Sequence, residues 1–100
     1  MSQLEQRAEQ RMRRAIEVAR TTPAVDIPVG AVIYGPDGTE IATGTNRRET
    51  DQDPAGHAEV LATRAAARAL GTWRLDGCEL VVTLEPVSYT HLRAHETDSY

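Results

Sequence analysis

The stretch Asp53-Pro54-Ala55-Gly56-His57-Ala58-Glu59 decides how the middle of this 100-residue chain folds. The residues after it are rich in alanine, which has the highest helix propensity, and Gly71 is a natural C-terminal stop. The sequence therefore predicts a helix over residues 57–70. Its small side chains would let it pack closely against a sheet.

Two side chains at the start of this helix carry possible chemistry. His57 offers a nitrogen to a metal ion, and Glu59 can pass a proton. In mid-helix these residues would point apart, but in the first turn both can lean over the open end of the helix. That end has free N–H groups and a partial positive charge, which favour an anionic oxygen. Taken alone, a His-x-Glu triplet is most often a surface pair without chemistry.

The chain before this stretch predicts a helix followed by a hairpin. Ser2-Gln3-Leu4-Glu5 is a capping box, and one apolar helix face follows, ended by Thr21-Thr22-Pro23 and formed by Leu4, Ala8, Met12, Ile16 and Ala19. The opposite face carries five arginines, which indicate either a solvated face or a partial phosphate-binding surface: Arg7, Arg11, Arg13, Arg14 and Arg20. Residues 27–34 and 39–45 predict two strands joined by the turn Gly35-Pro36-Asp37-Gly38. Asn46 lies just past the second strand, where spacing alone favours a turn-forming role.

The chain after the second helix predicts one more strand, over residues 78–84. Trp73 is interpreted as a packing anchor, and Cys78 as a small core residue and not a metal ligand. The strand leads into Thr83-Leu84-Glu85-Pro86, which we expect to arrive near the start of the second helix.

The amino-acid composition limits which class of protein this chain can be. The chain has 40% apolar and 26% charged residues, which is typical of one small folded domain. No apolar run is long enough to span a membrane, and the N-terminus lacks a signal-peptide core. A single cysteine excludes an internal disulfide and suits the cytoplasm. The net charge of −4 is unusual for a nucleic-acid-binding protein, so any RNA-binding surface must be a local patch.

These motifs together resemble the zinc-dependent nucleobase deaminases, whose signature is His-x-Glu followed by Pro-Cys-x-x-Cys. The resemblance covers residues 4–86 and is greatest with the bacterial tRNA adenosine deaminases, which convert the wobble adenosine of an anticodon to inosine. It implies a three-layer α/β/α fold of the cytidine-deaminase type with a mixed sheet, here truncated after the third strand. It also implies Zn²⁺ as cofactor, a tRNA anticodon stem-loop as partner, and a homodimer in the intact protein.

The resemblance also assigns roles to residues. It implies His57 as a zinc ligand, Glu59 as the catalytic proton carrier, and Asn46 and the backbone near Ala58 as contacts to the target base. The two cysteine ligands of the family would fall at positions 87 and 90, where this chain has Val87 and Thr90. We therefore expect this chain to bind zinc weakly and to be inactive.

The last part of the chain has a different character. Residues 87–100 show no helical or strand periodicity and resemble one translated reading frame of a transposase-type sequencing adapter. We expect residues 1–86 to be the N-terminal part of a deaminase domain and residues 87–100 to be a non-native tail. Without the rest of the domain, the third strand would leave an unpaired sheet edge.

Two other functions stay open. A deaminase of a free base or nucleotide, such as cytosine, guanine or dCMP, shares the same motifs and fits the acidic composition slightly better. A non-catalytic fragment is the third reading, and it predicts that changing Glu59 alters only stability.

Overall fold

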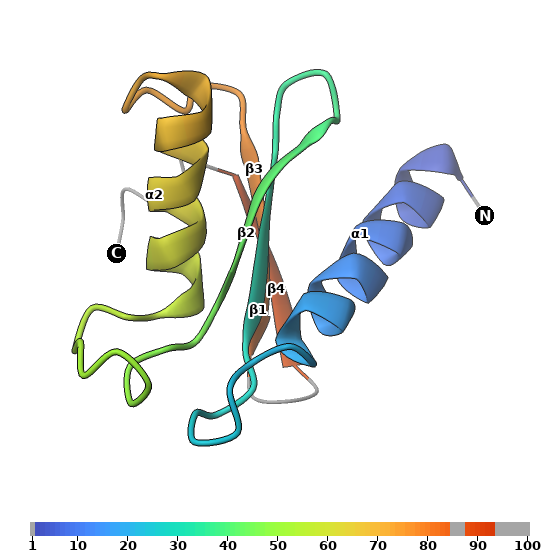
Figure 1. The fold of residues 1–100 in the computed structure, drawn as a ribbon. Coiled ribbons are helices and arrows are strands. Elements are labelled where there is room, and N and C mark those ends of the chain that lie inside the picture. Colours follow the sequence, from blue (N-terminus) through green and yellow to red (C-terminus); the bar gives the residue numbers. More distant parts are fainter. Residues whose placement is uncertain (1, 85–87, 94–100) are drawn as a thin grey trace.

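The protein is a small sheet with one helix on each face, shown edge-on in Figure 1. The structure is a computed structural model that describes residues 2–84 and 88–93, with the backbone path alone for residue 84 and residues 88–93. The elements follow in the order α1 (Gln3–Ala19), β1 (Gly30–Tyr34), β2 (Glu40–Thr45), α2 (Ala58–Leu70), β3 (Glu79–Leu84) and β4 (Ser88–Arg93). Within this part of the chain, no helix is long and apolar enough to cross a membrane.

The first helix begins and ends where the sequence predicts. The Ser2 hydroxyl caps it by accepting a hydrogen bond from the Glu5 N–H at 3.2 Å. Its buried face is shorter than predicted, since Ala15, Val18 and Ala19 are buried whereas Leu4 is 68% exposed. The reason is geometric: the start of α1 leans away from the sheet (Figure 1), so Leu4 stays exposed, whereas Met12 still packs against the core.

The sheet has the order β2-β1-β3-β4, and every ladder in it is antiparallel. The expectation of a mixed sheet is not met within the described residues. A parallel neighbour for β3 would need a crossover of a dozen or more residues, whereas only three residues separate β3 from β4. A connection of that length returns the chain as a hairpin.

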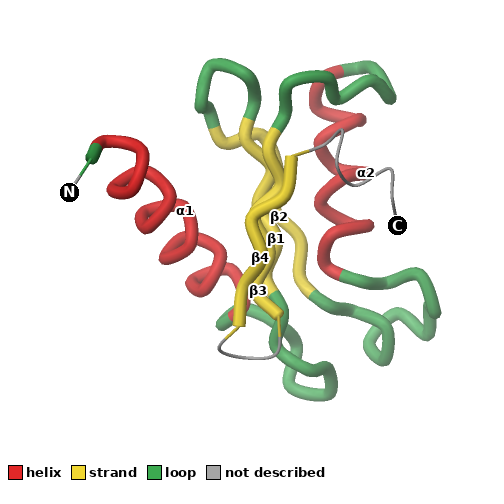
Figure 2. The backbone as a smooth tube through the Cα atoms, turned by 180° about the vertical axis from the view of Figure 1, so that it is seen from behind, coloured by secondary structure: helices red, strands yellow, loops and turns green. Residues whose placement is uncertain are grey.

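The fourth strand corrects the prediction for the end of the chain. The sequence predicts a tail outside the fold over residues 87–100, with the sheet ending at the third strand. Instead, Ser88–Arg93 pairs with β3 along six residue positions, and Figure 2 shows it on the outer side of the sheet. Ladder hydrogen bonds come from the backbone, so a segment without clear periodicity can still pair with an open strand edge.

The core has two halves, one on each face of the sheet. Alanines 58, 62 and 66 of α2 pack with Ala31, Ile33, Cys78, Leu80 and Val82. On the other face, Ala15 and Val18 of α1 pack with Val32, Tyr34 and Val81. The prediction that Cys78 is a core residue is confirmed, since it is 3% exposed. The prediction for Trp73 was wrong, because this side chain is 80% exposed beyond the end of α2, with the Arg74 guanidinium 5.4 Å from the centre of its ring.

Both helices meet the sheet through a glycine. A Cβ on Gly30 of β1 would lie 2.2 Å from the Ala15 carbonyl oxygen of α1. A Cβ on Gly44 of β2 would lie 2.5 Å from the Ala58 carbonyl oxygen and 2.6 Å from the Ala62 nitrogen of α2. Because Gly30 and Gly44 have no side chain, the helix backbones can approach the strands directly. At Gly44 this close approach fixes the first turn of α2 against the sheet.

Candidate functional site

The candidate site lies at the end of the sheet where three strands and a helix come together. The register pairs Gly30 with Thr45 and Ala31 with Val82, so β1 begins where β2 and β3 end. The first turn of α2 is at the same end because it packs on Gly44. The prediction that the third strand arrives near the start of α2 is borne out as far as Leu84, whereas Glu85 and Pro86 lie outside the described residues.

His57 and Glu59 occupy the positions at the helix start that the sequence predicts. His57 is the N-cap residue, with φ −74° and ψ 146°, and its exposed imidazole makes no capping hydrogen bond. Its carbonyl accepts the Leu61 N–H at 3.0 Å, which begins the helix. Glu59 is half-buried in the first turn. A carboxylate there is stabilised by the helix dipole whatever its chemical role.

Ala58 is buried at the contact between α2 and β2, with 1% of its surface exposed. It stands at the first helical position, where backbone N–H groups have no partner within the helix. The methyl side chain cannot bind a base by hydrogen bonds, so any contact from this residue must come from its backbone.

Asn46 is held by two neighbouring loops. Its amide nitrogen donates to the Ile27 carbonyl at 3.1 Å, and its carboxamide oxygen accepts from the Arg48 N–H at 3.2 Å. Its backbone N–H also donates to the Val29 carbonyl at 3.2 Å. These bonds are those of a turn-forming residue. One N–H and one oxygen lone pair of the carboxamide remain for a further partner.

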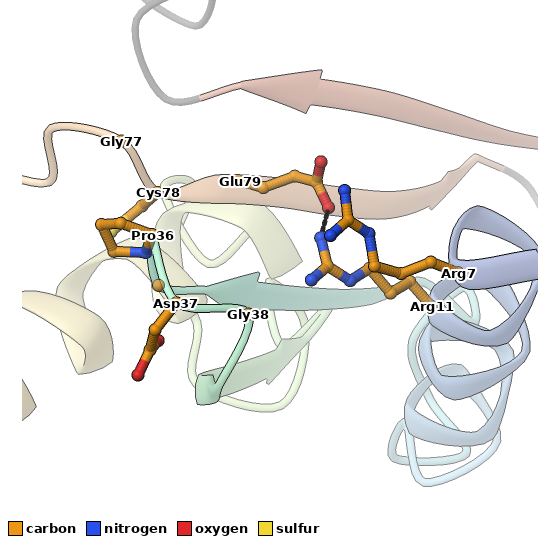
Figure 3. A pocket seen from close by; sticks show the side chains of 9 residues that line it. Arg7, Arg11, Pro36, Asp37, Gly38, Gly77, Cys78 and Glu79 are labelled. Carbon is orange, nitrogen blue, oxygen red and sulfur yellow. Dashed lines mark hydrogen bonds and ion pairs between the residues drawn. The ribbon is translucent and has the colours of Figure 1, made fainter. Parts of the chain in front are cut away.

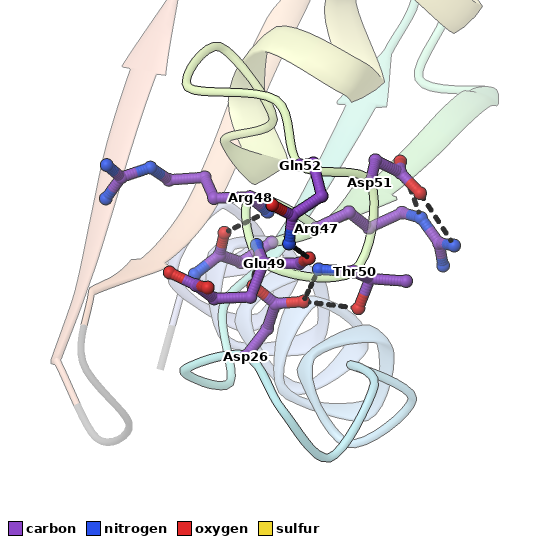
Figure 4. A network of polar contacts seen from close by, with 8 residues as sticks. Asp26, Arg47, Arg48, Glu49, Thr50, Asp51 and Gln52 are labelled. Carbon is purple, nitrogen blue, oxygen red and sulfur yellow. Dashed lines mark hydrogen bonds and ion pairs between the residues drawn. The ribbon is translucent and has the colours of Figure 1, made fainter.

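A buried carboxylate that sequence reasoning did not single out organises this end of the molecule. Asp26 is 6% exposed and accepts hydrogen bonds from the Glu49 N–H at 2.8 Å, the Thr50 N–H at 3.1 Å and the Thr50 hydroxyl at 2.5 Å. Figure 4 shows it beneath the loop that carries Arg47 and Asp51, whose side chains are themselves paired at 3.0 and 3.2 Å. The loop before α2 is thereby tied to the segment before β1.

The environment of Asp26 favours its charged form. Burial alone would raise its pKa, but the Thr50 hydroxyl, the two backbone N–H groups and the charge of Arg47 outweigh burial and hold the pKa below its usual range. No sequence signal marks this residue, because its partners lie more than twenty positions away in a loop with no regular pattern.

The described residues do not fit a zinc ion. Within residues 2–84 and 88–93, no group of three His, Cys, Asp or Glu side chains is placed to hold a metal ion. Zinc sites in proteins use at least three protein ligands, and His57 would supply only one of them. Cys78 cannot join it, because it is buried at the opposite end of β3, where burial and the charge of Asp76 raise the pKa of its thiol.

A hollow of about 300 Å³ opens at that opposite end of the sheet. Figure 3 shows Arg7 and Arg11 of α1 reaching toward the start of β3, where Arg11 forms an ion pair with Glu79. The Arg11 guanidinium also lies 4.3 Å from the centre of the Tyr34 ring. These contacts hold α1 on the sheet, so the charged side chains around this hollow are explained by a structural role.

The comparison with protein families decides the identity of the domain. Residues 5–88 match the family model described as the cytidine and deoxycytidylate deaminase zinc-binding region. The chain belongs to this family. Its α/β fold, with one helix on each face of the sheet, is therefore that of the first part of a cytidine-deaminase-like domain.

Individual deaminases resemble the chain over most of its length. It is 46% identical to the tRNA-specific adenosine deaminase of Bacillus subtilis over 76 residues, which is 75% of this chain and 47% of that enzyme. It matches the crystal structure of the guanine deaminase of B. subtilis with a TM-score of 0.70 and 40% identity, covering 86% of this chain and 52% of that one. A structure from a study of A-to-I editing by tRNA:A34 deaminases matches with a TM-score of 0.69 and 39% identity, covering 78% and 61%. The chain thus spans about half the length of these deaminases.

Proposed function

We propose that the intact protein deaminates adenosine to inosine by hydrolysis at the wobble position of a tRNA anticodon. The observation that carries the proposal is the 46% identity to a tRNA-specific adenosine deaminase over three quarters of the chain. The gathering of Asn46, His57 and Glu59 at one end of the sheet supports it. The proposed partner is the anticodon stem-loop, the proposed location is the cytoplasm, and the proposed assembly is a homodimer.

Each site residue has a role in this proposal. Glu59 takes a proton from the attacking water and passes it to the ring nitrogen beside the attacked carbon. It then carries the second water proton to the departing amine, which leaves as ammonia. His57 is a metal ligand through its exposed imidazole. The remaining hydrogen-bonding capacity of the Asn46 carboxamide and the backbone at Ala58 orient the target base. When bound in members of this family, Zn²⁺ supplies an activated water.

This chain by itself is proposed to be inactive. Val87 and Thr90 stand where the family signature requires cysteines, and neither side chain is a zinc ligand. We propose that residues 87–100 replace the native continuation of the domain. Sequencing the source gene across codon 87 tests this directly, because native cysteine codons after Pro86 would support it and their absence from an undamaged locus would refute it.

The activity is tested on the protein that the undamaged gene encodes. We expect that protein to form inosine in an arginine tRNA anticodon stem-loop, and to release little ammonia from guanine or cytidine under the same conditions. Glu59→Gln should lower the rate by about 10²–10⁴-fold, because it removes proton transfer without changing side-chain size. Formation of xanthine without inosine would refute the tRNA proposal.

Deamination of free guanine is the second candidate. The specific observation in its favour is the match to the guanine deaminase of B. subtilis, with 42% identity over 77 residues and a TM-score of 0.70. The two functions share the fold and the first part of the site, so the substrate comparison above separates them.

A further inference from the structure

A groove runs along the outer edge of β2, between the two helices. Strand β2 pairs only with β1 among the described strands, so its other edge is open. In Figure 1 this edge faces the viewer, with α1 and α2 on either side. The groove has a volume of about 640 Å³, and its floor is formed by Thr43, Gly44 and Thr45.

The walls of this groove are basic although the chain as a whole is acidic. Four arginines line it against one aspartate, Asp51, whereas the chain carries a net charge of −4. Arg14 and Arg47 are partly neutralised, since they pair with Glu40 and Asp51 respectively. The positive charge is therefore local, as an RNA-binding surface on an acidic protein would require.

Two of the four arginines have no acidic partner among the residues that the structure describes. Arg64 and Arg68 are both exposed on α2, and their side chains form no ion pair or hydrogen bond with another described residue. They are one helical turn apart, which places their Cβ atoms about 5–6 Å from each other. Their guanidinium groups can thus bind two successive anionic groups that lie along the groove, each through a planar pair of N–H donors.

We propose that this groove binds the sugar-phosphate backbone of the RNA substrate, with Arg64 and Arg68 contacting phosphates. The proposal rests on the proposed function, because it takes tRNA as the partner. An extended RNA strand suits the groove better than a compact anion, since residues of β2 and of both helices line it and two of its arginines stand one helical turn apart. Its lining includes Thr45 and Arg47, the residues directly before and after Asn46, so the groove adjoins the candidate site.

The test compares RNA binding by the full chain and by two double variants. Arg64→Gln/Arg68→Gln removes the two groove arginines, and Arg7→Gln/Arg13→Gln removes two exposed arginines of α1 outside the groove. Binding of a labelled arginine tRNA anticodon stem-loop and of an oligouridine is measured by fluorescence anisotropy at several salt concentrations. The groove variant should bind both RNAs roughly ten- to a hundredfold more weakly at 0.1 M salt, because each lost phosphate contact lowers the salt slope by about 0.7–0.9.

Three results would overturn the proposal. The first is equal binding by the groove variant and the control variant. The second is the absence of RNA binding by the unchanged chain. The third is stronger binding of poly-glutamate than of oligouridine of the same length, which would make the groove a site for acidic peptides.

The groove and the proposed function can fail separately. If the intact protein forms inosine while the groove variant still binds RNA normally, the groove proposal is wrong and the function stands. If RNA binds in the groove but the intact protein deaminates only guanine, the function is wrong and the groove is still an RNA-binding surface.

Discussion

Gly44 shows how a single missing side chain positions the candidate site. The first turn of α2, which carries Ala58 and follows His57, touches β2 backbone to backbone at this residue. Any side chain here would push the helix away from the strand. The distance between the helix start and the end of the sheet is therefore set by one residue.

Gly44→Ala should destabilise the protein by about 1–3 kcal/mol, which is the usual cost of forcing an extra group into a packed contact. The added Cβ would meet backbone atoms at 2.5 and 2.6 Å, and backbone cannot rotate aside as a side chain can. Chemical denaturation measures the change. Thr43→Ala on the same strand is the control, since Thr43 is exposed, and equal stability of the two variants would contradict this explanation.

The Asp26 carboxylate makes the stability of the folded protein depend on pH in the acidic range. Its pKa in the folded protein lies below its usual value, so folding favours the charged carboxylate. The stability that this provides is present above the pKa of the unfolded chain, about 3.9, and is lost as the pH falls through the lower folded value. We expect the melting temperature to fall steeply below pH 4.

Asp26→Asn should lower the melting temperature at pH 6 and make the fall below pH 4 shallower. An amide keeps one accepting oxygen but turns an NH₂ group toward N–H donors that need an acceptor. Asp76→Asn, in an exposed turn, controls for the loss of one negative charge. A melting curve of Asp26→Asn with the same pH dependence as the unchanged chain would show that Asp26 is not responsible.

At the scale of elements, local patterns predicted most of the fold and missed what depends on distant partners. The ends of α2 follow from the alanine run and from Gly71, which adopts φ 69° at the C-cap. Strand β1 begins three residues later than predicted, because Ile27 and Pro28 belong to the exposed segment that Asn46 and Asp26 hold. The positions of His57 and Glu59 at the start of α2 were predicted, whereas the place of Asp26 was not, since its partners are far away in sequence.

Strand β4 should contribute to stability through its backbone alone. A chain that ends at Pro86 would lose the ladder to β3 and leave that edge open, so we expect a lower melting temperature and more aggregation. A chain that ends at Arg93 keeps the six paired positions and is the control. Thermal melting with light scattering measures both. If the two chains melt alike, pairing with β4 does not stabilise the sheet.

At the scale of the whole molecule, the protein has the framework of a deaminase site with one proposed metal ligand. A ligand that binds only the folded state stabilises it by about 2.7 kcal/mol at a hundredfold excess over its dissociation constant. One histidine cannot provide such affinity for zinc. Neither zinc nor EDTA should therefore shift the melting temperature of this chain.

The zinc prediction is checked by thermal melting together with native mass spectrometry of the purified chain. His57→Ala is the matched control and should behave as the unchanged chain does. One zinc ion per chain that is lost in His57→Ala would contradict the prediction and would indicate ligands from the part of the chain outside the described residues.

The arginines beside β2 also have a consequence for how copies of the chain meet. The described sheet has two outer strands, and two copies approaching through β2 would bring like charges together, which costs free energy unless a polyanion lies between them. Self-association through β2 should therefore be disfavoured for this polypeptide, whereas an RNA strand lying between two copies would join them there.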